Sequence, residues 1–190
     1  MQYTNILCFG DSITRGSGSN CGGWVQRLRL EFEGDKDAGA CAVYNLGIMG
    51  EIVSETAGRI DWEARRRIDK DERLILVLAV GINDVYHKTP INKFEHDVVT
   101  LINTARTLTK HVVYVGLTAV DETLPMFKNF NTRAKEYDSA IARACKMNGV
   151  LYIPMFDVLQ PHDMPDGIHP NTKGYQKMYE RILPNLKGIF

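Results

Sequence analysis

The sequence predicts an α/β fold, a three-layer α/β/α sandwich around a five-stranded parallel sheet in strand order 2-1-3-4-5. Five short apolar runs are continuous rather than alternating, which is typical of strands covered on both faces. Between these runs the apolar residues recur at helical spacing, so strand and helix alternate, as in parallel βαβ units with right-handed crossovers. The sequence shows no repeat, low-complexity tract or linker, and we expect residues 1–190 to form a single domain.

The apolar runs are rich in valine, isoleucine and leucine, and at least three of them end in glycine. The expected strands are Asn5–Gly10, Ala42–Gly47, Leu74–Gly81, Val112–Leu117 and Val150–Pro154. Helical stripes cover residues 25–32, 53–68, 94–108, 134–144 and 175–186. Asn171 or Thr172 is placed to cap the last of these helices. We therefore expect a flavodoxin-like sheet.

Composition and charge argue against several classes of protein. Lys plus Arg number 23 and Asp plus Glu number 23, so no net basic field is available to bind a nucleic acid. No apolar run approaches the ~20 residues of a membrane span, and the N-terminus lacks the basic region of a signal peptide. We therefore expect a cytoplasmic protein with no membrane span and no nucleic-acid partner. The oligomeric state is left open.

The cysteines and histidines show no metal-binding pattern. The cysteines form no CxxC pair and have no metal-ligand spacing with histidine, so we expect mostly buried thiols and no metal site. They are Cys8, Cys21, Cys41 and Cys145.

The strand order predicts where a ligand binds. In open α/β sheets, ligands lie beyond the carboxyl ends of the strands, near the point where the strand order reverses. In this order the first strand lies between the second and the third. The turns after these three strands, residues 11–14, 47–50 and 82–84, are therefore expected to line one cleft.

Ser12 directly follows the first expected strand and is a candidate nucleophile. A serine on a tight strand-to-helix turn is held rigidly beside backbone N–H groups of the following helical turn. The alternative is that Ser12 only caps a helix, because serine is common at that position.

Asp166 precedes His169 by three positions, a spacing that lets the carboxylate bind the imidazole Nδ1–H and leave Nε2 free as a base. The alternative is a surface turn, because Asp-Gly is a strong turn signal. The fifth strand lies roughly 14 Å from the first at ~4.8 Å per strand. The segment 155–165 can span about 35 Å at about 3.3 Å per residue. His169 can therefore reach Ser12.

Three groups are candidate donors to an oxyanion: the side-chain amide of Asn83, the backbone N–H of Gly47 and the backbone N–H of Ser12. Acyl transfer needs such donors about 2.7–3.1 Å from the oxygen that becomes charged. Glycine lets a carbonyl approach the main chain closely. The alternatives are that Asn83 belongs to an ordinary turn and that Gly47 only ends a strand.

Four blocks of the sequence resemble those of the GDSL esterases and lipases, and of their SGNH-hydrolase subgroup. They occur in the family's order between residues 10 and 169, and the four letters of the subgroup's name map onto Ser12, Gly47, Asn83 and His169. Ile13 stands where the family name has leucine, a volume-conserving change. The resemblance implies a flavodoxin-like sandwich and serine-dependent hydrolysis of esters. The blocks are 10–14, the Gly47 turn, 81–84 and 166–169.

The expected reaction is a two-step acyl transfer by Ser12, His169 and Asp166 that needs no cofactor or metal. One alternative is a flavodoxin-like module that binds FMN or a phosphate ligand through the loop at residues 12–19. Another is a related scaffold without hydrolytic activity. His162 and Asp163 form a second candidate dyad, although their order is reversed.

Apolar residues on the turns that flank the expected cleft are candidates for the substrate pocket, and they are equally compatible with packing beneath the loops. The loops at 85–90 and 118–129 are expected to set specificity, because they follow the third and fourth strands. No separate amphipathic lid segment is evident, which favours small soluble ester substrates. The candidate pocket residues are Ile48, Met49, Tyr86, Pro125, Met126, Phe127 and Phe130.

Overall fold

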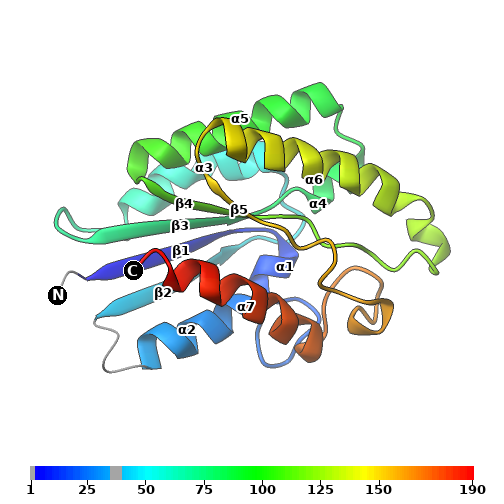
Figure 1. The fold of residues 1–190 in the computed structure, drawn as a ribbon, viewed down its shortest axis with the longest axis horizontal. Coiled ribbons are helices and arrows are strands. Elements are labelled where there is room, and N and C mark those ends of the chain that lie inside the picture. The colour runs from blue at the N-terminus through cyan, green and yellow to red at the C-terminus, as the bar shows by residue number, and fades with distance from the viewer. Residues whose placement is uncertain (1–2, 35–39) are drawn as a thin grey trace.

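A five-stranded parallel sheet forms the centre of the molecule, with helices on both faces (Figure 1). The structure is a computed structural model and describes residues 3–34 and 40–190. The strand order β2-β1-β3-β4-β5 confirms the predicted sandwich. The strands are β1 Thr4–Gly10, β2 Cys41–Gly47, β3 Arg73–Ala79, β4 His111–Val115 and β5 Leu151–Ile153.

Three strands end earlier than the apolar runs predicted, β3 and β4 by two residues and β5 by one. β3 ends at Ala79 because Gly81, with φ of +133°, turns the chain into the helix that follows. β4 ends at Val115, and the N–H of Leu117 donates to the side chain of Asp138 rather than to a neighbouring strand. The apolar residues just beyond β3 and β4, Val80 and Leu117, are nevertheless buried.

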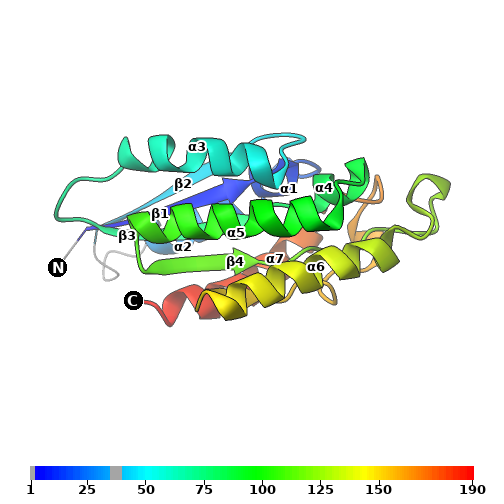
Figure 2. The same ribbon diagram turned by 90° about the horizontal axis from the view of Figure 1, so that it is seen from above.

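Seven α-helices cover the sheet in the described parts of the chain. α3, α5 and α6 lie on one face, and α2 and α7 lie on the other with the short α1 (Figures 1 and 2). Asn171 caps α7, because its side chain accepts from the N–H groups of Lys173 and Gly174. The helices are α1 Ser12–Arg15, α2 Trp24–Gly34, α3 Val53–Arg65, α4 Ile82–His87, α5 Ile91–Leu108, α6 Phe130–Met147 and α7 Thr172–Lys187.

The strand register places three turns at one edge of the sheet. Gly10 at the end of β1 pairs with Gly47 on one side and with Ala79 on the other, so β1, β2 and β3 end level. β1 lies between β2 and β3, and every one of its residues is buried, which holds this strand firmly. The segments that follow these strands therefore emerge side by side.

Two further expectations concern the thiols and the membrane. Cys8 and Cys145 are buried, whereas Cys21 is exposed and Cys41 is half-buried. Across residues 3–34 and 40–190, no helix has the length and apolar character needed to cross a bilayer.

Candidate active site

Ser12 is the first residue of α1, directly beyond the buried strand β1. The preceding Asp11 caps this short helix, with Oδ1 accepting from the N–H of Ile13 at 2.9 Å. Burial raises the pKa of the Asp11 carboxyl to about 7, although backbone hydrogen bonds act in the opposite direction. Ser12 itself is 6% exposed, so its backbone is fixed by packed neighbours on both sides.

The His169 ring contacts both Ser12 and Asp166. Its Nε2 lies 2.8 Å from Ser12 Oγ, across 157 positions of sequence. Its Nδ1 lies 2.7 Å from Asp166 Oδ2. When Nδ1 carries the proton and donates to the carboxylate, Nε2 is the free acceptor for the serine hydroxyl. The structure thus places these three side chains in one hydrogen-bonded chain, with the base oriented toward the hydroxyl.

Asp166 is held as a charged carboxylate by the residues that follow it. Its Oδ1 accepts from the N–H groups of His169 at 2.8 Å and of Ile168 at 3.1 Å. Burial acts to raise the pKa of Asp166, but the hydrogen bonds from the His169 ring and from these backbone groups outweigh it. The pKa of Asp166 therefore lies below its ordinary value, and the carboxylate is ionised at neutral pH.

Asp163 anchors the loop that carries His169 rather than supplying a second dyad. Its buried Oδ2 accepts from Lys177 Nζ at 2.6 Å and from the N–H of Gln160 at 2.9 Å. The side chain of His162 is 75% exposed, with Nε2 at 3.6 Å from Asp163 Oδ1. His162 has no contact with Ser12 among the hydrogen bonds of the described residues. The alternative dyad of His162 and Asp163 therefore has no serine hydroxyl bonded to it among the described residues.

Gly47 is a packing residue in this structure. Its N–H donates to Asn45 Oδ1 at 3.1 Å, so it is not free to face an oxyanion. A β-carbon at this position would lie 2.3 Å from the backbone nitrogen of Arg15. Glycine is required here because β2 ends against α1, and the expectation that Gly47 is a donor is not supported by its geometry.

Gly50 is a candidate donor that the sequence analysis missed. The Glu51 N–H donates to the Ile48 carbonyl at 3.3 Å, which closes a turn with Gly50 at its third position. Gly50 has φ of +77°, as the third residue of a type II turn requires. Its N–H has no acceptor among residues 3–34 and 40–190, and a β-carbon there would meet open space. The second glycine of the Gly47–Gly50 turn was the available signal.

Asn83 lies in the first turn of α4 and is joined to this same turn. Its Nδ2 donates to the backbone carbonyl of Glu51 at 3.0 Å. The amide nitrogen carries two protons, so one remains for another acceptor. The neighbouring Asp84 accepts from the N–H of Val53 at 3.0 Å, and burial raises the pKa of its carboxyl to about 6. These bonds tie α4 to the start of α3.

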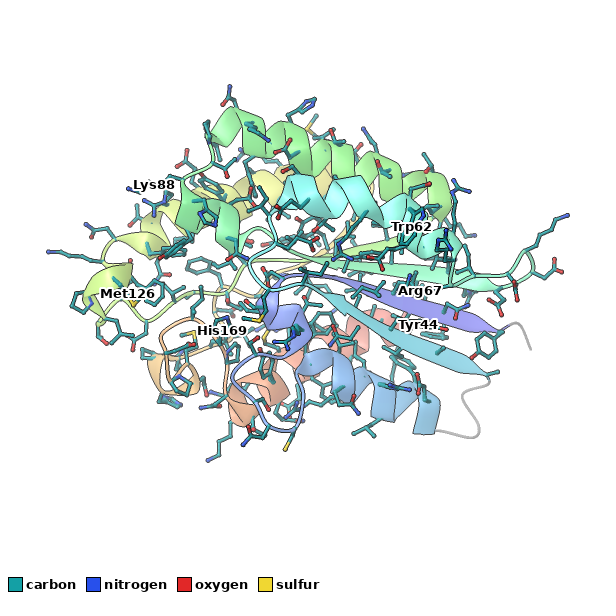
Figure 3. The ribbon with its side chains drawn as sticks, turned by 180° about the vertical axis from the view of Figure 1, so that it is seen from behind. Tyr44, Trp62, Arg67, Lys88, Met126 and His169 are labelled. Carbon is teal, nitrogen blue, oxygen red and sulfur yellow. The ribbon has the colours of Figure 1, made fainter. Side chains whose placement is uncertain are left out.

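The candidate pocket residues divide into an exposed group and a buried group. Ile48, Met49, Tyr86 and Met126 are 47%, 60%, 52% and 68% exposed. Phe127 is 2% exposed and packs beneath Gly167, so the expectation that it lines an open pocket is wrong. In Figure 3, Met126 and His169 lie toward the same end of the molecule.

Two other kinds of site, a large cleft and a metal-binding cluster, would be alternatives to the site at Ser12. A cleft of about 580 Å³ opens at the opposite edge of the sheet, around Arg73, Lys110 and His111, away from Ser12. In the described ranges no group of three or more His, Cys, Asp or Glu side chains is placed to hold a metal ion.

A family model for the GDSL-like lipase/acylhydrolase family matches residues 8–177. The chain belongs to this family. It is therefore a serine hydrolase that acts on ester bonds. Membership of this family favours ester hydrolysis over the alternative of a flavodoxin-like module that binds FMN. A search of the curated proteins by sequence finds no match.

Solved structures of similar fold agree with this membership. A member of the lipolytic protein G-D-S-L family from Veillonella parvula is 22% identical, covers 95% of this chain and 97% of its own, and has a TM-score of 0.78. An alpha/beta hydrolase from the Lake Arreo metagenome is 18% identical, with coverages of 95% and 93% and a TM-score of 0.78. An acetylxylan esterase from Geobacillus stearothermophilus is 18% identical, with coverages of 95% and 92% and a TM-score of 0.74. At these identities the likeness shows the fold.

Proposed function

We propose that this GDSL-family chain hydrolyses small carboxylic esters through an acyl-enzyme formed on Ser12, with His169 as the base and Asp166 as its partner. The observation that carries the proposal is the chain of two hydrogen bonds, 2.8 Å from Ser12 Oγ to His169 Nε2 and 2.7 Å from Nδ1 to Asp166. This arrangement activates a hydroxyl that is otherwise a weak nucleophile.

The reaction has two steps. His169 Nε2 takes the proton of Ser12 Oγ while that oxygen bonds to the ester carbonyl carbon, and the carbonyl oxygen becomes an oxyanion. Collapse breaks the bond to the alcohol oxygen, which leaves with the proton from His169. Water then attacks the acyl-serine, with His169 again as the base, and the acid is released. Asp166 stabilises the imidazolium in both steps.

We assign the oxyanion donors to the backbone N–H groups of Ser12 and Gly50 and to the side-chain amide of Asn83. The N–H of Ser12, like that of Gly50, has no acceptor within the described ranges. Asn83 donates one proton to the carbonyl of Glu51, next to Gly50, and retains the other. Gly50 replaces Gly47 in this role because the N–H of Gly47 is already bonded to Asn45.

The similar proteins support the assignment of the acid–base residues. Catalytic mutants of the acetylxylan esterase replace a serine, an aspartate or a histidine by alanine. In that enzyme the aspartate precedes the histidine by three positions, which is the spacing of Asp166 and His169. Esters of acetyl and other short acyl groups are therefore the first substrates to test, followed by thioesters and lysophospholipids.

A substrate panel tests the proposed function. Wild-type chain and Ser12→Ala are assayed with p-nitrophenyl esters of increasing acyl length, acetylated sugars, an acyl thioester and a lysophospholipid. We expect hydrolysis of short-chain esters by the wild type and its loss in Ser12→Ala. Ester hydrolysis that persists above a few per cent in Ser12→Ala would contradict the proposed nucleophile.

A further inference from the structure

Glu51 and Arg59 form a buried ion pair that the proposed reaction leaves unused. Arg59 Nε and Nη2 donate to Glu51 Oε1 and Oε2, each at 2.5 Å, in a bidentate pair. The Glu51 side chain is 4% exposed and that of Arg59 is 16% exposed. Desolvating two charges is costly unless their geometry and remaining hydrogen bonds compensate. Such a pair is weak evidence for stability alone, and its location next to Gly50 indicates a further role.

Arg59 joins three separate parts of the structure. Besides Glu51, its guanidinium donates to the backbone carbonyl of Leu46 at 2.7 Å and to Glu63 at 2.9 Å. It also lies 5.1 Å from the centre of the Phe9 ring on β1. Four of its five N–H protons are thus engaged. The guanidinium therefore holds the 47–50 turn at both ends, through the Leu46 carbonyl in β2 before it and the Glu51 side chain after it.

Glu51 is bonded both to the turn that presents the Gly50 N–H and to the Asn83 side chain. Its side chain is bound by Arg59, its carbonyl accepts from Asn83 and its N–H closes the turn that presents Gly50. The turn residues Ile48 and Gly50 are themselves exposed and gain little from packing. Without the ion pair, this exposed turn would depend on backbone hydrogen bonds such as that from the Ile48 N–H to the Gly10 carbonyl.

We propose that the Glu51–Arg59 ion pair positions the Gly50 N–H and the Asn83 amide for the oxyanion. Glu51 and Arg59 are positioning residues, because neither contacts the reacting atoms in the proposed mechanism. The inference rests on the proposed function. A donor displaced by about 1 Å costs up to about 10²-fold in rate, so a well-held turn has a direct effect on kcat.

Four variants separate positioning from general stability. Arg59→Met and Glu51→Gln each remove one charge, and the single substitutions risk misfolding by leaving the other charge buried. The double variant Glu51→Gln/Arg59→Met removes both charges and leaves no unpaired ion. Arg65→Met is the matched control, because it breaks the exposed pair between Arg65 and Asp61 on the same helix. Circular dichroism and thermal unfolding establish that each variant is folded.

Two kinetic readouts test the role. The first is kcat and KM for p-nitrophenyl acetate, together with the pH profile of kcat. The second is inhibition by a trifluoromethyl ketone, to whose carbonyl carbon Ser12 Oγ adds, with its proton passing to His169 and the ketone oxygen becoming the oxyanion. We expect the double variant to lose about 10- to 100-fold in kcat with KM and pH profile unchanged. The inhibition constant should rise by the factor by which kcat/KM falls.

The outcomes distinguish this inference from the proposed function. A folded double variant that retains wild-type kcat, or loses kcat without weaker inhibition by the ketone, overturns the inference while leaving Ser12 as nucleophile. An equal loss in Arg65→Met also overturns it, because that pair has no contact with the Gly50 turn. A wild-type chain that hydrolyses no ester overturns the proposed function and the inference together.

Discussion

The two halves of the proposed active site are held in place by different means. On the acid–base side, Asp166 lies on a loop with its side chain 56% exposed. On the oxyanion side, Glu51 is 4% exposed and paired with Arg59. The water that cleaves the acyl-serine must reach His169, so this side of the site has to be open, whereas donors to an oxyanion must keep one position. The segment that carries the acid–base residues is therefore open to water, and a separate, buried ion pair holds the segment that carries the donors.

The largest expected effect comes from breaking the acid–base half. Ser12→Ala or His169→Ala should lower kcat/KM by about 10⁴-fold or more, because nucleophile and base act as one unit. The measurement is steady-state hydrolysis of p-nitrophenyl acetate. His162→Ala is the control and should retain wild-type activity, since His162 is exposed and does not contact Ser12. A loss in His162→Ala equal to that in His169→Ala would contradict the assignment.

Breaking the oxyanion half should cost less. Asn83→Ala removes one donor and should lower kcat by about 10²–10³-fold with little change in KM, because the interaction is made mainly in the transition state. Separate determination of kcat and KM checks this. A rise in KM at constant kcat would show instead that Asn83 binds the substrate in its ground state.

The same two halves differ in how far the sequence predicted them. Residue type and spacing predicted the three side chains that the structure joins by hydrogen bonds, Ser12, His169 and Asp166, because a hydroxyl, an imidazole and a carboxylate carry their chemistry in the side chain. The fold was predictable as well, since continuous apolar runs alternate with helical stripes. Strand ends were predicted less well, because Val80 and Leu117 are buried although they lie beyond the ends of β3 and β4, so the apolar runs are longer than the strands.

The backbone donors could not be read in the same way. Gly47 and Gly50 differ only in conformation and in where their N–H groups point, and a glycine has no side chain to show this. The buried pair of Glu51 and Arg59 could not be predicted either, because glutamate and arginine are mostly exposed and nothing in the sequence marks these two as buried. Burial is decided by tertiary packing.

The buried carboxyl of Asp11 makes the stability of the fold depend on pH. The pKa of Asp11 is raised to about 7, so the folded state holds this proton more tightly than the unfolded chain does. The free energy of unfolding should therefore fall as pH rises from about 4 to about 7. Asp11→Asn stays neutral and should show a flatter pH dependence in urea unfolding across that range.

Asp166 contributes to stability with the opposite dependence on pH. Its pKa is lowered by hydrogen bonds, so its contribution to stability is present above the ordinary aspartate pKa and is lost as pH falls through the folded value. Identical pH slopes for wild type and Asp11→Asn would contradict the raised pKa of Asp11.

The smallest expected effect on catalysis comes from the exposed candidate pocket residues, such as Met126. Met126→Ala should raise KM for longer acyl esters by about tenfold or less, with kcat unchanged, because an exposed side chain offers only modest apolar contact. Phe127→Ala is the contrasting variant, since a buried phenylalanine removed from beneath Gly167 should lower stability by about 3–5 kcal/mol. An acyl-length profile and thermal unfolding distinguish the two.

The pairing of Ser12 with His169 is tested most directly by a fluorophosphonate probe followed by peptide mass spectrometry. The probe reacts only with a serine oxygen made nucleophilic by a neighbouring base. The proposed mechanism predicts one adduct, on Ser12, in the wild type and its loss in His169→Ala. An adduct on another residue, or labelling of Ser12 that is unchanged in His169→Ala, would contradict it.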